Sequence, residues 1–201
     1  AIDSSTISLV ANHMDWAKHR RRKAAAKLHL TLDLETFLPR FAVVEKAKHH
    51  DSTLAEALAA DLKPGEIATF DKAYIKFAFL HRLTERGVFW VGRAKDNMQY
   101  ETIESKTIKP DSKIIRDELI SLTNDKSSQQ YPECFRLVEA LVEVNGKEKQ
   151  MIFITNNMDW APSSVCDLYK CRWGIEVFFK EMKQSLKLTD FLGYSDNAVQ
   201  W

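Results

Sequence analysis

Alternating apolar and polar residues predict two early strands in this chain. Residues 27–34 (KLHLTLDL) carry leucine at every second position, which is typical of a strand with one buried face. An apolar run at 37–44 follows a short turn, so the two segments are expected to pair antiparallel. Asp51 would then cap a short amphipathic helix in LAEALAADL, and Pro64-Gly65 would end it.

The next segment has the pattern of a β-α-β unit. Apolar residues at 67–70 predict a buried strand, and Asp71 stands at its carboxyl end. Helical spacing over 74–86, stopped by Gly87, predicts a helix, and 88–91 predicts a second strand. Because the strands of such a unit lie parallel, Asp71 would occupy the carboxyl edge of an open sheet, where functional sites gather.

Residues 93–157 change to the pattern of a β-rich insertion. Polar and apolar residues alternate along three segments, and Asn145-Gly146 between two of them is a strong signal for a hairpin turn. Residues 127–130 (SSQQ) are expected to form a mobile loop. The alternating segments are 113–122, 135–144 and 150–155.

One long helix is predicted near the end of the sequence. Pro162 offers a start, and about 20 residues follow without another proline. At 100° per residue, the apolar side chains fall within an arc of roughly 100°, the expected buried face. Beside it, within about 60° of one another, lie Tyr169, Arg172, Glu176 and Lys183. The buried face would contain Leu168, Ile175, Phe178, Phe179, Met182 and Leu186.

The polar edge of this helix has two interpretations. Arg172 with Glu176, and Glu176 with Lys180, are i,i+4 pairs that would form surface salt bridges worth a few tenths of a kcal/mol. Alternatively, the edge is a functional row about 21 Å long, which corresponds to roughly six phosphate steps of a duplex strand. Evidence from the rest of the chain must decide between them.

Length and composition restrict the class of protein. The 201 residues are 45% hydrophobic, enough to bury one large domain or a domain with a subdomain. No apolar run approaches about 18 residues and no signal peptide opens the sequence, so neither membrane insertion nor secretion is predicted. Cys134, Cys166 and Cys171 form no CxxC pair, which fits a reducing cytoplasm without structural zinc.

Charge is unevenly distributed although the net charge is only +1. Residues 18–27 hold six lysines and arginines and no acid, and residues 170–187 hold five against Glu176 and Glu181. The remaining residues carry 18 basic and 26 acidic side chains. Two basic segments on an otherwise acidic chain indicate an anionic partner, nucleic acid first, although solvated basic loops would give the same pattern.

Three acidic residues stand out by position: Asp3 at a strand, Asp71 at the end of another, and Glu176 on a helix edge. A carboxylate that borders a core is costly unless its charge is compensated. A divalent cation would compensate, since Mg²⁺ is usually held by one or two carboxylates with water and substrate phosphate. For any one of the three, a helix cap or a surface acid is the plain alternative.

The helix motif resembles a family signature. Tyr169, Arg172, Glu176 and Lys183 match Y-(2)-R-(3)-E-(6)-K at every interval, so the chain resembles the catalytic domain of DDE transposases from bacterial insertion sequences, specifically the insertion sequence four family. Asp3 in IDSST matches that family's first acidic motif, ID-(S/G)-(S/T).

The family's second acidic motif, D-(1)-G/A-(1)-Y/F, is matched more loosely. Asp71 and Ala73 fit it, but Tyr74 follows Ala73 directly. Further similarity runs through WAKHRRRKAAAKLH, FWVGRAK and YKCRWGIEVFFKEMKQ and so covers essentially the whole chain.

The resemblance implies a ribonuclease-H-like α/β fold, a mixed five-stranded sheet flanked by helices with a β-rich insertion before the helix that carries the catalytic Glu176. Residues 1–92 would form the first part of the core, 93–157 the insertion and 158–201 the C-terminal helix of the core. Asp3 would lie on the first strand, which is expected to begin upstream of Ile2.

The resemblance also implies a chemistry. Asp3, Asp71 and Glu176 would be catalytic and would bind two Mg²⁺ or Mn²⁺ ions. Metal-activated water would cleave a phosphodiester at a transposon end, and the freed 3′-OH would attack a second DNA strand. The protein would act in the bacterial cytoplasm, at the nucleoid, as a homodimer assembled on inverted-repeat ends and target DNA.

Basic residues and the tyrosine of the signature are the candidates for DNA contact. Those on the helix would grip the backbone near the cut, and the others are secondary candidates because exposed basic residues are common. The full set is Tyr169, Arg172, Lys183, Arg93, Lys95, Arg21 and Arg22.

Aromatic residues and histidines give weaker signals. Trp90, Trp160 and Trp173 would stack on an unpaired base or, as the favoured alternative, lie in the core. The pair His49-His50 is not predicted to bind metal, because adjacent residues of a strand point to opposite faces.

Two other functions remain open from the sequence. A domesticated or truncated remnant would bind DNA without cutting it, whereas a general ribonuclease-H-like nuclease would cut without preference for transposon ends. Intact acidic residues favour an enzyme, and a nicking assay that compares wild type with Asp71→Ala would separate the transposase from the inactive remnant.

Overall fold

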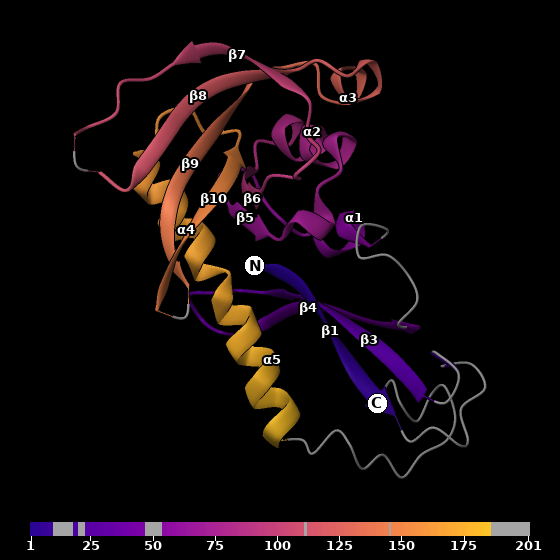
Figure 1. Cartoon of the computed structure of the whole chain (residues 1–201). Helices are drawn as coiled ribbons and strands as arrows, with labels where there is room; N and C mark the ends of the chain where they lie inside the picture. The colour runs from indigo at the N-terminus through magenta and orange to yellow at the C-terminus, as the bar shows by residue number, and fades with distance from the viewer. Residues whose placement is uncertain (10–17, 20–22, 47–53, 111, 145, 186–201) are drawn as a thin grey trace. The chain divides into compact units, whose positions relative to one another are not determined.

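A computed structural model of the chain separates into two compact units. The first unit consists of Ala1–Ala59 and Trp173–Trp201, and the second of Ala60–Arg172. The structure describes residues 1–9, 18–19, 23–46, 54–110, 112–144 and 146–185. Helices and strands occur in both units, which confirms the predicted α/β class (Figure 1).

The first unit contains an antiparallel sheet. β3 (Lys23–Leu32) pairs with β1 (Ile2–Leu9) on one side and with β4 (Pro39–Lys46) and the short β2 (Lys18–His19) on the other. This confirms the strand pair expected from 27–34 and 37–44. Asp3 lies in β1 opposite Leu30.

Period-two alternation decides which face of β3 is covered. Leu30 and Leu32 point to α5 (Trp173–Ser185) and form an apolar cluster with its Ile175 and Phe179, all at most 4% exposed. Thr31, between them, donates a hydrogen bond to the Leu58 carbonyl of α1 (Ala55–Leu58) at 2.5 Å, so α1 lies on the other face. α1 is shorter than predicted, and the expected Asp51 cap lies outside the described residues.

The second unit begins with the predicted β-α-β unit. β5 (Ile67–Phe70) and β6 (Phe89–Arg93) pair in parallel. The helix between them, α2, spans Phe77–Glu85 and begins three residues later than predicted, because Lys72–Tyr74 form a 3₁₀ helix and Lys76 is extended. Gly87 ends this segment with φ +70°, a conformation that glycine adopts without strain.

Four antiparallel strands extend this sheet from β6. β10 pairs with β6 and β9, β9 with β8, and β8 with β7. Each of β7 and β8 contains one irregular step, at Thr102/Glu104 and Ile114/Arg116. β7 had no counterpart among the predicted strands. The bounds are β7 Tyr100–Ser105, β8 Ile114–Leu122, β9 Phe135–Val144 and β10 Lys147–Thr155.

Helices cover both faces of the second sheet (Figure 1). α4 (Pro162–Cys171) lies on one face, and α2 with α3 (Asp125–Gln130) on the other. The expected loop at 127–130 is therefore wrong, because Asn124 caps a helix there by accepting the N–H of Ser127.

Polar networks lie on both faces of this sheet, one buried and one half-buried. Arg136 and Asp117, 2% and 4% exposed, form a bidentate ion pair at 2.6 and 2.7 Å. On the other face, Thr84 Oγ1 accepts Trp90 Nε1 at 3.0 Å and Asn156 Nδ2 at 3.1 Å. These groups are paired, as buried polar groups must be to avoid a desolvation penalty.

The predicted long helix is two helices that meet at Arg172. α4 ends at Cys171 and α5 begins at Trp173, while Arg172 keeps helical angles (φ −52°, ψ −33°) and its N–H bonds the Tyr169 carbonyl in an i→i−3 step. The expected buried face is confirmed in part. Ile175 and Phe179 are buried, Leu168, Phe178 and Met182 are half-buried, and Leu186 lies outside the described residues.

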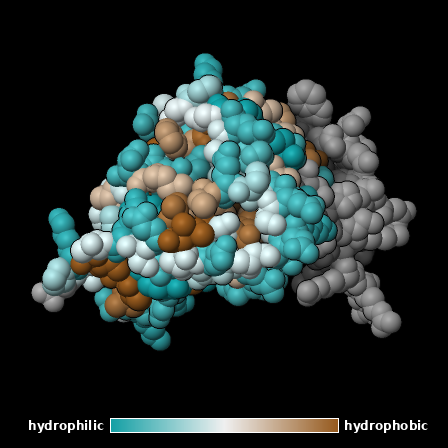
Figure 2. All heavy atoms as spheres, turned by 90° about the horizontal axis from the view of Figure 1, so that it is seen from above, coloured by the Kyte–Doolittle hydropathy of each residue, from teal (hydrophilic) through white to brown (hydrophobic). Residues whose placement is uncertain are grey.

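Hydrophilic side chains dominate the face shown in Figure 2, where apolar residues form small, separate patches. Among the described residues, the most exposed large apolar side chains of the first unit are Leu38, Val177 and Phe37, at 64%, 51% and 50%. No helix in the described ranges is long and apolar enough to cross a membrane.

Candidate active site

Asp71 lies at the first residue after β5 and caps the 3₁₀ helix. Its backbone is extended, and its Oδ1 accepts the N–H of Lys72 at 2.7 Å. The same oxygen accepts the hydroxyl of Tyr169 at 3.3 Å. No hydrogen bond from another described residue reaches Oδ2, so one oxygen of this half-buried carboxylate is available to a ligand.

Tyr169 reaches Asp71 from α4. Its side chain is 3% exposed and its ring lies 4.8 Å from that of Phe153 on β10. Burial raises the pKa of the Tyr169 hydroxyl to about 12, and the neighbouring charge of Arg172 only partly opposes this. At neutral pH Tyr169 is therefore protonated and donates to the carboxylate.

Arg172 lies over the ring of Tyr169, with its guanidinium carbon 5.3 Å from the ring centroid. Such a cation–π contact is worth about 0.5–2 kcal/mol, more when desolvated, and Arg172 is only 6% exposed. Arg93, at the end of β6, is close enough for its charge to lower the pKa of the Tyr169 hydroxyl as well. Asp71, Tyr169 and Arg172 thus form one connected group in the second unit.

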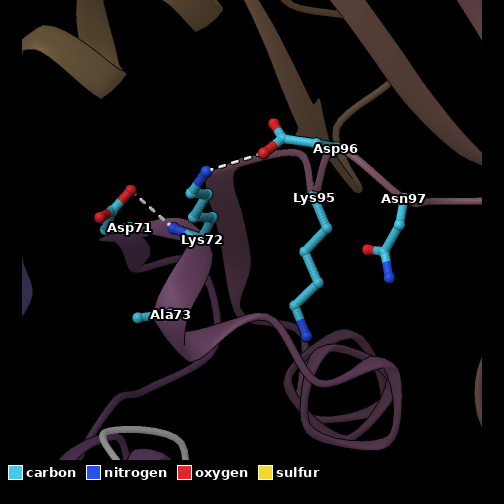
Figure 3. Close-up of a pocket in the computed structure, with 6 residues that line it drawn as sticks. All are labelled: Asp71, Lys72, Ala73, Lys95, Asp96 and Asn97. Carbon is cyan, nitrogen blue, oxygen red and sulfur yellow. Dashed lines mark hydrogen bonds and ion pairs between the residues drawn. The ribbon is translucent and has the colours of Figure 1, made fainter.

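A hollow of about 510 Å³ opens beside this group (Figure 3). Lys72 points to Asp96 and forms an ion pair at 3.0 Å, which lowers the pKa of the Asp96 carboxyl. The Lys95 side chain extends away from that pair. The lining residues are Asp71, Lys72, Ala73, Lys95, Asp96 and Asn97.

Lys72 and Asp96 were not among the predicted site residues. A signal for them exists in the sequence, because Lys72 lies two residues after β5 and Asp96 three residues after β6. The carboxyl ends of parallel strands meet at one edge of a sheet, so the argument that selected Asp71 also selects these neighbours.

Asp3, Glu176 and Lys183 belong to the first unit. Asp3 is half-buried, and its Oδ1 accepts the N–H of Ser4 at 2.7 Å. Glu176 is exposed in the first turn of α5, and Lys183 is half-buried in the last. The structure therefore brings Asp71, Tyr169 and Arg172 together in the second unit. Asp3, Glu176 and Lys183 lie in the first unit.

The donor chemistry suits a hard divalent cation, because carboxylate oxygens are what Mg²⁺ and Mn²⁺ prefer. The available Oδ2 of Asp71 fits such a role. Within each unit, the part of the chain that the structure describes contains no group of three His, Cys, Asp or Glu side chains placed to hold an ion. The predicted carboxylates are divided, with Asp71 in one unit and Asp3 and Glu176 in the other.

The remaining candidates are placed as follows. Lys95 is exposed beside Asp71, whereas Arg21 and Arg22, like His49-His50, lie outside the described residues. Trp90 is fully buried among Tyr131 and Phe135, which confirms the core alternative for this residue. Trp160 and Trp173 are half-buried.

Comparison with known proteins gives a consistent result. The sequence model for the transposase DDE domain matches residues 1–200. The chain is 28% identical over 98% of its length to a protein of Geobacillus stearothermophilus named "Probable transposase for insertion sequence element IS5377", and covers 51% of that protein. It is 29% identical over 99% of its length to a protein of Sinorhizobium fredii (strain NBRC 101917 / NGR234) named as a transposase, y4zB, and covers 55% of it.

A more distant relative is the transposase for insertion sequence element IS231E of Bacillus thuringiensis subsp. finitimus. It is 25% identical over 84% of this chain, which covers 45% of that protein. The chain thus spans about half the length of the curated relatives it matches.

Proposed function

Because this chain belongs to the transposase DDE domain family, we propose that it is the catalytic part of an insertion-sequence transposase, which cleaves DNA phosphodiesters at the ends of the element and transfers the freed 3′-OH to target DNA. The observation that carries the proposal is the Asp71 carboxylate. It is held at the end of β5 by Tyr169 of the helix signature, over which Arg172 lies, and it keeps one oxygen available.

Asp3, Asp71 and Glu176 are the proposed ligands of two Mg²⁺ or Mn²⁺ ions. Bound there, the ions would supply Lewis-acid activation of the attacking oxygen and stabilise the leaving one. The chain's own contribution begins at Asp71, where the Lys72 N–H and the Tyr169 hydroxyl hold Oδ1 and so orient Oδ2. Tyr169 is protonated and can do this at neutral pH, and its raised pKa of about 12 extends the range further into alkaline pH.

DNA is the proposed substrate, with Lys95, Arg93 and Lys183 as backbone contacts. Arg172 is expected to act in part through Tyr169, because its guanidinium lies over that ring and keeps it against Asp71. Arg21 and Arg22 remain candidates from their charge alone.

The proposed architecture is ribonuclease-H-like, with 93–157 as a β-rich insertion between core parts 1–92 and 158–201. The parallel β5–β6 pair and the strands β7 to β10 before α4 support it. A homodimer assembled on DNA in the bacterial cytoplasm completes the proposal.

A nicking assay tests the chemistry. With Mn²⁺ and supercoiled plasmid, Asp71→Asn is expected to lower the cleavage rate by roughly two orders of magnitude or more, because the variant keeps the shape of the side chain but loses the anionic oxygen. Asp96→Asn, an exposed acid in the same hollow, is the matched control and should cleave nearly as well as wild type.

A crystal soaked in Mn²⁺ tests metal binding independently. Anomalous density is expected beside Asp71 Oδ2, and its absence at saturating metal in an ordered site would overturn the ligand assignment. Metal binding without any cleavage would favour a DNA-binding remnant instead. Cleavage with no preference for inverted-repeat ends would favour a general nuclease.

A further inference from the structure

A second hollow, of about 540 Å³, continues the one beside Asp71. Lys95 and Asn97 line both hollows, so the two are contiguous within the second unit. The second hollow extends past the start of α2 to α3, where Lys76 and Lys126 line it. We call the part lined by Lys76, Lys95 and Lys126 the lysine groove.

The residues that line the second hollow carry an excess of positive charge. No acidic residue lines the second hollow. Within the described ranges, the ammonium groups of the three lysines form no ion pair or hydrogen bond, whereas Lys72 nearby is paired with Asp96 at 3.0 Å. Three exposed ammonium groups around one concave surface favour an anion that carries several charges.

The framework around the groove is held by side-chain hydrogen bonds. Asn124 caps α3 by accepting the Ser127 N–H, and its Nδ2 donates to Gln99 Oε1 at 3.4 Å. The Thr123 N–H also donates to the Gln99 carbonyl at 3.2 Å. These contacts join α3, which carries Lys126, to the segment after β6, which carries Lys95.

We propose that the lysine groove binds backbone phosphates of the DNA strand next to the bond cleaved at Asp71. The inference rests on the proposed function and adds Lys76 and Lys126 to it. Lysine supplies a point charge suited to phosphate, and the amide side chains of Asn97, Gln99 and Gln130, which also line the hollow, can donate to phosphate oxygens. Such contacts position the strand without reading its sequence.

The test measures the salt dependence of DNA binding. The whole chain is titrated with a fluorescent duplex oligonucleotide at several salt concentrations, as wild type and as Lys76→Gln/Lys126→Gln. Each lost phosphate contact reduces the slope of log K against log salt by about 0.9, so the double variant should lose about 1.8. Lys63→Gln/Lys149→Gln, two exposed lysines of the same unit outside the groove, is the control and should keep the wild-type slope.

The outcomes separate the groove from the proposed function. An unchanged slope in the groove variant, with wild type binding duplex normally, overturns the groove and leaves the transposase proposal standing. An equal loss in the control variant also overturns it, because the effect is then one of general charge. A wild-type chain that does not bind duplex at all overturns both. Circular dichroism and the Tm of each variant should match wild type, since all four positions are exposed.

Discussion

The two units of the chain hold their cores together in different ways. In the first unit, α5 covers the sheet through an apolar cluster of Leu30, Leu32, Ile175 and Phe179. Among the described residues of this unit, the buried polar side chains are Thr31 and His29, whose Nε2 lies 3.2 Å from Glu45 Oε1. In the second unit, the sheet buries a pair of fully charged side chains, Arg136 and Asp117, on one face, and the half-buried Thr84 network lies on the other.

This difference predicts how each unit responds to change. Apolar contacts are non-directional and tolerate small shifts, whereas a buried ion pair becomes strongly unfavourable when one partner is lost. The second unit also holds Asp71 between Tyr169 and the Lys72 N–H, so a directional network supports the candidate site. Three measurements would test this comparison.

The largest effect is expected for Asp117→Ala. It leaves the Arg136 guanidinium, 2% exposed, without its carboxylate, which should cost roughly 3–5 kcal/mol of unfolding free energy. Denaturant unfolding measures the loss, and hydrogen exchange should place it in Ala60–Arg172. Asp33→Ala, at an exposed turn of the first unit, is the control and should cost far less.

A double variant tests whether the stability lost in Asp117→Ala comes from the unpaired buried charge or from lost packing. Asp117→Leu/Arg136→Met removes both charges and should recover part of the stability lost in Asp117→Ala. Recovery would be incomplete because Arg136 Nη1 also donates to the Trp160 carbonyl at 2.5 Å. If the double variant is less stable than the single one, charge burial is not the cause.

Alanine substitution at two glycines, one in each unit, is expected to affect stability differently. A Cβ at Gly92 in β6 would lie 2.7 Å from Ile75 Cδ1 and 3.0 Å from Phe70 Cε2, so Gly92→Ala should destabilise by about 1–3 kcal/mol. At Gly174 in α5 the nearest atoms are Leu34 Cδ2 at 3.2 Å and Phe37 Cζ at 3.4 Å.

Gly174→Ala is expected to be neutral or stabilising by up to about 1 kcal/mol. Alanine favours the helix, and the two neighbours are side-chain ends that can shift, Phe37 being half exposed. The Tm of Gly92→Ala and of Gly174→Ala, each compared with wild type, tests both expectations. A large loss at Gly174 would show that the first unit is packed as tightly as the second.

The smallest effect concerns acid stability. Burial raises the pKa of the Glu139 carboxyl, but hydrogen bonds from Gln150 and Arg116 outweigh burial and hold the pKa below its ordinary value of 4.5. A lowered folded-state pKa gives stability that is present above about 4.5 and is lost as the pH falls below it. Glu139→Gln should therefore flatten the fall in unfolding free energy on acidification.

Asp33 provides the counterpart in the first unit. Backbone N–H groups of Thr36 and Glu35 lower the pKa of this carboxyl too, but it is exposed to solvent. Asp33→Asn should change the acid response less than Glu139→Gln, because solvent screens an exposed carboxylate. An equal or larger change would mean that acid sensitivity is not concentrated in the second unit.

Regular patterns in the sequence predicted much of the fold. β5 and β9 have the bounds expected from their apolar runs, because a buried face requires alternation or continuity that is visible in the chain itself. β7 carries mostly exposed residues and exists through its pairing with β8, a long-range cause that no local pattern reveals. α3 has no buried residue and depends on the Asn124 cap.

The candidate site was predictable to a different extent. Asp71 was selected by its position after a strand, and Tyr169 by its spacing to Arg172, but their contact joins residues 98 positions apart. The ion pair of Arg136 with Asp117 gave no sequence signal, because isolated charged residues on alternating strands normally face solvent. Whether the three acids meet at one pair of ions stays a prediction.

The irregular step in β7 has a consequence for behaviour at high concentration. β7 is the last strand of the second unit's sheet among those the structure describes, and its residues from Glu101 to Ser105 are exposed. An exposed edge strand without such a break could pair with strands of other molecules. The irregular step at Thr102/Glu104 interrupts the row of backbone N–H and C=O groups along this edge. Glu101 and Glu104 add negative charges that repel a second copy of the strand. The edge therefore favours a chain that stays dispersed instead of forming fibres.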